Sequence, residues 1–275
     1  MNIVTVCRGV TIALSSLLAC ACATSPTGRS QFLLVPPETA IEASAAAYVD
    51  TVGQLREERQ LLDDPQLAAR VMVTAGRVVA AAVTQYPHTA DWDWSVALID
   101  APDTVNAWCM AGGRMAIYSG IVYKLGLTDD ELANVLGHEV SHAIANHTAE
   151  QMSMALATNL VLMAVAANND DWETQLAMEL AASLAVTLPN SRAGETEADR
   201  MGIELAARAG YDPGASASLW LKMEEEGGSN SLQFLSTHPS SDNRRTALLE
   251  LGQQVRPLMP AVPPTPYPIE VLTAY

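Results

Sequence analysis

The chain has 275 residues, of which 49% are hydrophobic and only 5% aromatic, and its formal net charge is −16. This length predicts one domain with a substantial core, and the abundance of Ala, Leu and Val favours helices. The negative charge and the absence of any block of Lys and Arg exclude binding to nucleic acid, or to anionic lipid, through a basic face.

The N-terminal residues are typical of a lipoprotein signal. Residues 9–19 are apolar but too few to span a bilayer, as in the hydrophobic region of a secretory signal. Residues 17–20, Leu-Leu-Ala-Cys, resemble a lipobox, which predicts cleavage before Cys20 and a lipid on its sulfur. An ordinary signal peptide cut two or four residues later is the alternative. Because Ala21 is not an acidic retention signal, we expect anchoring at the periplasmic face of the outer membrane.

These boundaries predict a signal peptide at residues 1–19 and a polar, Pro-bearing tether at residues 20–37. Once Cys20 carries lipid, Cys22 and Cys109 are the cysteines left in the mature chain. An oxidising compartment would allow a disulfide between them, and an unpaired Cys109 is the alternative.

Two helices are expected to begin the main domain. Residues 38–61 form the first of them. Asp64 and Pro65 suit the N-cap and first position of the second helix, which runs to a stop at Pro87.

Strand signals follow these helices. Every second side chain in residues 94–99 would face a core, and this alternation predicts a strand. Residues 105–110 and 114–118, joined across Gly112 and Gly113, predict a β-hairpin. The chain is therefore expected to be α+β: mostly helical, with a small antiparallel sheet packed beside the next helix.

The helix after the hairpin has a clear N-terminal signal. Thr128 can serve as its N-cap, and Glu131 can reach back to form a capping box. Apolar residues then recur at helical spacing through Ala143, and Gly137 is the one weak position. A small residue there could let a strand or a substrate come close.

This helix carries the sequence HEVSH at residues 138–142. Positions i and i+4 share one helical face, so His138 and His142 can bind one metal ion. Glu139 lies on the adjoining edge, within reach of a water on that metal. Two nitrogen ligands and a general base in one turn are what a zinc-dependent hydrolase needs. Two ordinary histidines on a surface helix are the alternative.

A catalytic zinc ion takes three protein ligands and one water. The acidic segment at residues 191–200 has helical spacing and places Glu195 and Asp199 on one face. We expect Glu195 to be the third ligand, and Asp199 to accept the outer N–H of a ligating histidine. Glu197 is two residues from each and is expected to point elsewhere. Taken alone, this segment would be a solvated acidic helix start.

An apolar stretch at residues 152–167 separates the two motifs and ends at the polar residues 168–171. It is shorter than the about 20 residues that cross a bilayer. We expect a buried or partly exposed helix whose Met side chains could contact substrate, followed by another helix at residues 172–187.

His238 precedes Pro239, which restricts its backbone. It could stabilise a tetrahedral intermediate, occupy the open position of the metal and keep the enzyme latent, or have no role in the site. Arg244 could fix a site carboxylate, contact substrate or form a surface ion pair. A last helix is expected to end near Val255, before an extended or disordered Pro-rich tail at residues 256–275.

The other two histidines are not expected at the metal. His147 would lie about 180° around a regular helix from His138, so it is expected to contact another helix or solvent. His88 is expected to be exposed in a turn.

Residues 138–142 and the pattern Ser-Arg-x-x-Glu-x-x-Ala-Asp at residues 191–199 together resemble the HtpX and CAAX-prenyl-protease family of gluzincin metallopeptidases. Three further segments agree with this likeness: Thr27-Gly28-Arg29 with residues 31–35, Asn106-Ala107-Trp108 with Gly112-Gly113, and Thr237-His238-Pro239 with Arg244. The likeness covers about residues 26–250 and is closest to the bacterial lipoprotein branch, without a helical-repeat domain. One departure is Ala111, which precedes the Gly pair at a position where many relatives have Pro. This difference bears on how stiff the Gly112-Gly113 turn is, and not on the metal site.

The resemblance implies a zincin-type metallopeptidase domain at residues 38–255 with one zinc ion per chain. It implies endopeptidase activity on misfolded or unassembled envelope proteins, and hence a role in protein quality control. An extended substrate could add to the strand at Asn106, Ala107 and Trp108 through backbone hydrogen bonds.

Two alternatives to the enzyme stay open: a non-proteolytic chaperone or assembly factor for outer-membrane proteins, and a structural zinc lipoprotein. An intact Glu139 favours the enzyme, since a closed structural site needs no base. The chaperone is favoured only if His238 blocks the metal permanently.

Overall fold

The computed structural model describes residues 22–166, 190–227, 233–238 and 243–274. They fall into two compact units, described separately: residues 22–39 with 149–166, and residues 40–148 with the described residues from 190 onward. The predicted signal peptide, Cys20 and the helix expected at residues 172–187 lie outside the described residues. Most described residues are helical and small sheets complete the fold, so the expected α+β class is confirmed.

The smaller unit combines a hairpin with most of a long helix. Strands β1 (Cys22–Thr24) and β2 (Ser30–Phe32) pair antiparallel. Helix α6 (His147–Ala166) belongs to this unit from its third residue. Its Met154 and Leu160 side chains are exposed, so the expected partly exposed helix is confirmed over its described part.

Hydrogen bonds tie the predicted tether to α6 within this unit. Arg29 donates to the two carboxylate oxygens of Glu150 at 2.9 and 2.7 Å, and Gln31 donates to the same carboxylate at 3.0 Å. The backbone N–H of Val35 donates to the hydroxyl of Ser153 at 2.9 Å. The described part of the tether is therefore an integral part of its unit.

A four-stranded mixed sheet lies in the larger unit. Its order is β4-β5-β3-β6, with bounds β3 (Ser95–Ile99), β4 (Ala107–Met110), β5 (Arg114–Tyr118) and β6 (Glu270–Leu272). The expected antiparallel hairpin of β4 and β5 is confirmed, but β3 runs parallel to both β5 and β6. A purely antiparallel sheet was the wrong expectation, because β3 pairs with the second hairpin strand and with a strand from the tail. The tail at residues 256–275 thus carries an edge strand of the sheet.

The hairpin turn depends on glycine. Gly112 and Gly113 both have a φ of +85°, which L side chains rarely adopt. A Cβ on Gly113 would also lie 2.6 Å from the ring of Trp94. Ala111, the departure from the family pattern, is buried beside these two residues. The turn therefore needs glycine both for its backbone conformation and for space.

Both faces of the sheet are covered. One set of alternating side chains, including Leu98, belongs to the main core with helices α3 (Pro65–Gln85) and α5 (Asp129–Ile144). The opposite set, including Ala97, packs against Tyr48 and Val52 of α2 (Pro37–Glu57). Burial on both faces holds the hairpin in place beside α5.

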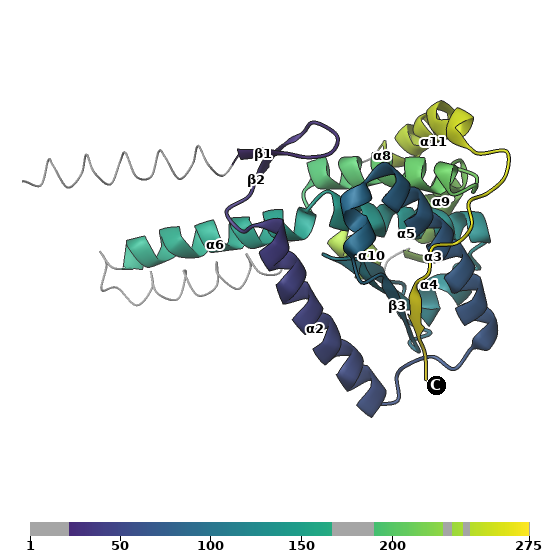
Figure 1. The fold of residues 1–275 in the computed structure, drawn as a ribbon, viewed down its shortest axis with the longest axis horizontal. Helices are drawn as coiled ribbons and strands as arrows, with labels where there is room; N and C mark the ends of the chain where they lie inside the picture. The colour runs from purple at the N-terminus through teal and green to yellow at the C-terminus, as the bar shows by residue number, and fades with distance from the viewer. Residues whose placement is uncertain (1–21, 167–189, 228–232, 239–242, 275) are drawn as a thin grey trace, which may run out of the picture. The chain divides into compact units, whose positions relative to one another are not determined.

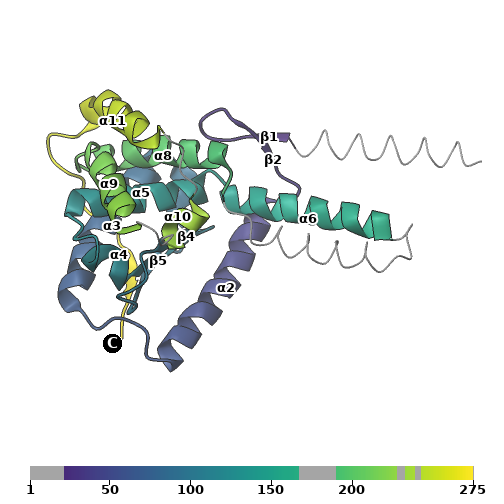
Figure 2. The ribbon, with the colours of Figure 1, turned by 180° about the vertical axis from the view of Figure 1, so that it is seen from behind.

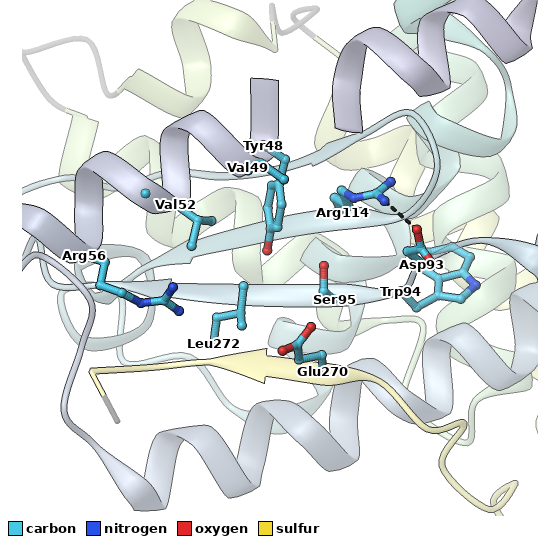
Figure 3. A pocket seen from close by; sticks show the side chains of 11 residues that line it. Tyr48, Val49, Val52, Arg56, Asp93, Trp94, Ser95, Arg114, Glu270 and Leu272 are labelled. Atoms are coloured by element: carbon cyan, nitrogen blue, oxygen red, sulfur yellow. Dashed lines mark hydrogen bonds and ion pairs between the residues drawn. The ribbon is translucent and has the colours of Figure 1, made fainter. Parts of the chain in front are cut away.

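A cavity of about 590 Å³ lies on the α2 side of the sheet (Figure 3). Tyr48 and Arg56 of α2 line one side, while Ser95, Arg114 and Glu270 of the strands line the other. None of the residues that line it belongs to the histidine motif or to the acidic segment at residues 191–200.

The helices of the main core are α3 (Pro65–Gln85), α4 (Ser119–Tyr123), α5 (Asp129–Ile144), α8 (Arg192–Arg208), α9 (Ala215–Gly227), α10 (Gln233–Thr237) and α11 (Arg244–Val255), with the short 3-10 helices η1 (Pro87–Asp91) and η2 (Arg256–Leu258). Helix α11 lies beside α8 and α9 in both views (Figures 1 and 2). The predicted N-cap of α3 is confirmed, since Asp64 accepts hydrogen bonds from the backbone N–H groups of Gln66 and Leu67. Among the described residues, α3 is the one helix long and apolar enough to cross a membrane, but its Val71 and Val78 are part of the core.

Helices α5 and α8 cross in very close contact. A Cβ on Gly137 of α5 would lie 2.4 Å from the carbonyl oxygen of Gly202 of α8. A Cβ on Gly202 would lie 2.6 Å from the backbone nitrogen of His138. The segment that Gly137 admits is thus a helix, neither a strand nor a substrate. This pair of glycines sets the distance between the histidine motif and the acidic segment.

Replacing Gly202 with alanine should separate these helices and destabilise the protein. Helix propensity alone predicts the opposite sign, because Ala is better than Gly in a helix by about 1 kcal/mol. We expect Gly202→Ala to lower the free energy of unfolding by about 1–3 kcal/mol, the usual effect of overpacking. Urea denaturation followed by circular dichroism measures this change.

Gly53→Ala in α2 is the matched control, since nothing lies within 4 Å of a Cβ at that position. It should raise the free energy of unfolding, as helix propensity alone predicts. Equal stabilisation by both substitutions would contradict tight packing at Gly202.

Candidate metal centre

The helix that carries the histidine motif is fixed at its N-terminus. Thr128 and Glu131 form the predicted capping box: the Thr128 N–H donates to the Glu131 carboxylate at 2.9 Å, and the Glu131 N–H donates to the Thr128 hydroxyl at 3.2 Å. Lys222 of α9 donates to the same carboxylate at 2.6 Å. Burial opposes ionisation of Glu131, but the hydrogen bonds from Lys222, the Thr128 N–H and Ser218, with the charge of Lys222, together outweigh burial and lower the pKa of the carboxyl. This network fixes where α5 begins, and so where its histidines lie.

The structure brings three predicted ligands together. The Nε2 atoms of His138 and His142 lie 3.0 Å apart. Glu195, from α8, approaches each ring with a different carboxylate oxygen: Oε2 lies 3.5 Å from Nε2 of His138, and Oε1 lies 3.4 Å from Nε2 of His142. All three side chains are buried. Their donor atoms therefore converge on one point between α5 and α8.

His238 brings a fourth donor atom to this cluster. Its Nδ1 lies 3.2 Å from Nε2 of His138 and 3.1 Å from Oε1 of Glu195. The residue follows α10, and its backbone N–H donates to the carbonyl of Phe234 at 2.9 Å. The His238 and Phe234 rings stack with centroids 4.3 Å apart. His238 is thus held beside the three predicted ligands.

The spacing of these atoms fits a tetrahedral zinc ion. With metal–ligand distances of about 2.0–2.1 Å, neighbouring ligand atoms of such a site lie about 3.3 Å apart. The closest approaches between these side chains run from 3.0 to 3.5 Å, and four donor atoms, one from each residue, all lie within 4.8 Å of one another. The donor atoms of the cluster are imidazole nitrogens and a carboxylate oxygen, which are common ligands of zinc in proteins. The residues therefore fit zinc, one ion per chain.

Outer hydrogen bonds orient two of the ligands. Oδ1 of Asp199 lies 3.0 Å from Nδ1 of His138, on the side of the ring away from the cluster. Arg244 donates to Asp199 at 2.7 and 2.8 Å and to Glu195 at 3.0 Å, and its guanidinium lies 3.8 Å from the ring centre of Trp220. Arg244 is buried, so it fixes site carboxylates and does not form a surface ion pair.

The charges around the cluster favour a cation. Burial opposes protonation of His138, but its hydrogen bonds with Asp199 and Glu195 outweigh burial and raise its pKa to about 10. Burial also opposes ionisation of Glu195, yet hydrogen bonds from His138 and His238 lower its pKa. The buried carboxylates thus attract positive charge, which either a proton or a metal ion can supply.

Glu139 lies beside the cluster, and one of its two carboxylate oxygens makes no hydrogen bond to the described residues. Its side chain is buried, and within the described chain its Oε1 has no hydrogen-bond partner. Nε2 of His238 is 3.5 Å from that oxygen. Burial raises the pKa of Glu139, although His238 and His138 act to lower it. An unpartnered buried carboxylate oxygen here fits a group that handles a proton from a water molecule.

The sequence analysis did not predict the contact between His147 and Glu197. Helix α5 ends at Ile144, and Asn146 has a φ of 57°, so the chain turns and His147 begins a new helix. Nδ1 of His147 then lies 2.7 Å from Nδ1 of His142, and Nε2 lies 3.0 Å from Glu197. The signal was Asn146, because Asn often ends a helix in this left-handed conformation.

Other predicted residues lie near the cluster or away from it. Asn106 is buried and directly precedes β4, the edge strand that starts at Ala107 and includes Trp108, and this strand packs against α5. Cys109 of the same strand is buried and is a free cysteine. His88 is exposed in η1, as predicted.

Comparison with known proteins points to one family. The model of peptidase family M48 matches residues 65–251. The mitochondrial metalloendopeptidase OMA1 of Schizosaccharomyces pombe is 37% identical over 157 residues, covering 56% of this chain and 45% of that protein. Human OMA1 is 29% identical over 231 residues, covering 79% of this chain and 43% of its own length. The β-barrel assembly-enhancing protease of Escherichia coli K12 is 29% identical over 227 residues, covering 76% and 43%.

The chain spans less than half the length of each of these three relatives. Two of them carry the name of a metalloendopeptidase and the third that of a protease. The similarity therefore applies to less than half of each relative.

Proposed function

The chain belongs to peptidase family M48, and on this premise we propose that the protein is a zinc-dependent endopeptidase. The observation that carries the proposal is the convergence of His138, His142 and Glu195 beside the unpartnered carboxylate oxygen of Glu139. A purely structural zinc site has no need of a buried base next to its ligands.

The residues divide the chemistry between them. When bound, zinc supplies a Lewis acid that activates water near neutral pH and polarises the scissile carbonyl. Glu139 accepts the proton of the attacking water and delivers it to the nitrogen of the leaving amine. His138, His142 and Glu195 hold the ion, and Asp199 keeps the N–H of His138 on its outer nitrogen. Burial raises the pKa of Glu139, which brings this base closer to neutral pH.

We propose that an extended polypeptide is bound along β4, at Asn106, Ala107 and Trp108. The support is that β4 is an edge strand of the sheet and packs against α5, the helix of Glu139. Backbone hydrogen bonds to an edge strand recognise extended chain more than particular side chains. Unfolded or misfolded proteins are the substrates that such recognition suits.

We further propose that the protein acts in protein quality control at the bacterial cell envelope, anchored by lipid on Cys20. The support is the lipobox at residues 17–20 and the similarity to a protease named for enhancing β-barrel assembly. The periplasmic face of the outer membrane fits the absence of an acidic residue at Ala21.

The central test is Glu139→Gln. Glutamine keeps the size of the side chain but cannot accept the proton, so we expect cleavage of casein to fall by about 10²-fold or more. Zinc content should stay at one ion per chain, because Glu139 is not a ligand. Gel-based cleavage assays, with and without chelator, and metal analysis measure the two quantities.

Glu204→Gln is the matched control, since it makes the same change at a glutamate of α8 that pairs with Arg208 and is not part of the cluster. It should leave casein cleavage by the folded protein unchanged. Equal cleavage by wild type and Glu139→Gln would end the assignment of a protease.

We propose that His238 is a latch that holds the site closed in this conformation. Its Nδ1 lies among the ligand atoms, where it could be a fourth ligand to a bound zinc ion, and its Nε2 faces Glu139. A fourth protein ligand fills zinc and leaves no position for water or substrate. Release of α10 would then be the step that activates the enzyme.

His238→Ala should therefore raise the basal rate of casein cleavage several-fold while zinc stays bound. Ser236→Ala, an exposed position on the same short helix, is the control and should leave the rate unchanged. A tenfold fall in rate with zinc retained would instead show that His238 supports the transition state. Inactivity of both wild type and His238→Ala, with zinc bound, would favour the non-proteolytic chaperone.

A further inference from the structure

A chain of three buried side chains leads away from one of the zinc-site histidines. Nδ1 of His142 lies 2.7 Å from Nδ1 of His147, and Nε2 of His147 lies 3.0 Å from Oε2 of Glu197. The side chains of His147 and Glu197 are 5% and 2% exposed, so water does not compete for these contacts. In each such contact one atom must donate a proton and the other must accept it. The position of the proton on one ring therefore determines its position on the next.

Metal binding fixes that order. To bind zinc, Nε2 of His142 must present its lone pair, so the proton of a neutral ring lies on Nδ1. His142 therefore donates from Nδ1, and Nδ1 of His147 accepts. The proton of His147 then lies on Nε2 and is donated to the carboxylate of Glu197. In the reverse order the proton of His142 would lie on Nε2, and that nitrogen could not bind the ion.

We propose that His147 and Glu197 are positioning residues for the zinc ligand His142. They hold its ring in the tautomer and orientation that bind the ion, and the charge of Glu197 acts on the ligand through the intervening imidazole. Asp199 occupies the corresponding place beside His138, where a carboxylate contacts the ligand directly. The proposal rests on the proposed function only through its zinc site, and not through peptide cleavage.

Glu197 of α8 and His147, the first residue of α6, supply this relay. Glu195, Glu197 and Asp199 alternate along α8, and residue 197 faces away from the other two on a regular helix. That side of α8 is where His147 begins α6 after the turn at Asn146. Helix α8 therefore supplies the ligand Glu195, the carboxylate that contacts His138 (Asp199) and the carboxylate that contacts His147 (Glu197).

The test measures zinc affinity in the absence of any substrate. Glu197→Gln keeps the shape of the side chain but removes its charge, and His147→Phe keeps a ring but removes both hydrogen bonds. We expect each to weaken zinc binding by about 10–100-fold, the usual effect of losing such an outer partner. Competition with a chromophoric chelator gives the dissociation constant of the full-length protein.

Two further measurements separate positioning from folding. The double variant should bind zinc no more weakly than the weaker single variant, because both substitutions break one relay. The visible spectrum of the cobalt-loaded protein should change in each variant, as it reports ligand geometry. Glu204→Gln, the same change at a glutamate of α8 that pairs with Arg208, should leave both readouts unchanged.

Zinc dissociation constants within twofold of wild type in Glu197→Gln, with an unchanged cobalt spectrum, would overturn the proposal. If His147→Phe fails to fold, the isosteric Glu197→Gln decides alone. A wild-type chain that binds no zinc would overturn the zinc site itself, which is a separate outcome. Loss of zinc affinity in these variants would stand even if Glu139→Gln cleaved casein normally.

Discussion

The close crossing of α5 and α8 is the constraint from which the site follows. Gly137 and Gly202 let the backbones approach so closely that a Cβ on either would meet main-chain atoms of the other helix. At that distance the acidic face of α8 reaches the histidines of α5, and Glu195 joins His138 and His142 at one point. The capping box of α5 fixes where that helix begins, and the glycine pair fixes how near its partner lies.

Each proposed ligand also contacts a polar side chain that is not itself a proposed ligand. His138 contacts Asp199, His142 contacts His147, and Glu195 accepts from Arg244. Buried charges are costly unless they are paired, so this outer layer also makes the cluster compatible with the core. Because the ligands are held before any ion arrives, less ordering is needed when it binds.

The elements with local signals were predictable from the sequence. The HEVSH motif, the capping box at Thr128 and the cap of α3 at Asp64 each depend on residues within a few positions, and the structure has them as expected. The spacing of Glu195 and Asp199 on one helical face likewise followed from the sequence alone.

One of the misses has a non-local cause, and the other comes from a local signal that was overlooked. The parallel pairing of β3 with β5 and β6 joins strands that are far apart in the sequence, and no local pattern encodes it. His147 was placed on a continuous helix because the stop at Asn146 was not recognised. Glu197 faces away from Glu195 and Asp199 as expected, but its contact with His147 depends on that same turn and was not predicted.

The most direct test of a zinc ion at this cluster is a crystal structure of the zinc-loaded full chain, with anomalous data at the zinc absorption edge. One peak per chain is expected, about 2.0–2.2 Å from Nε2 of His138, Nε2 of His142 and a carboxylate oxygen of Glu195. An anomalous peak held by other residues, with none at this cluster, would contradict the proposed site.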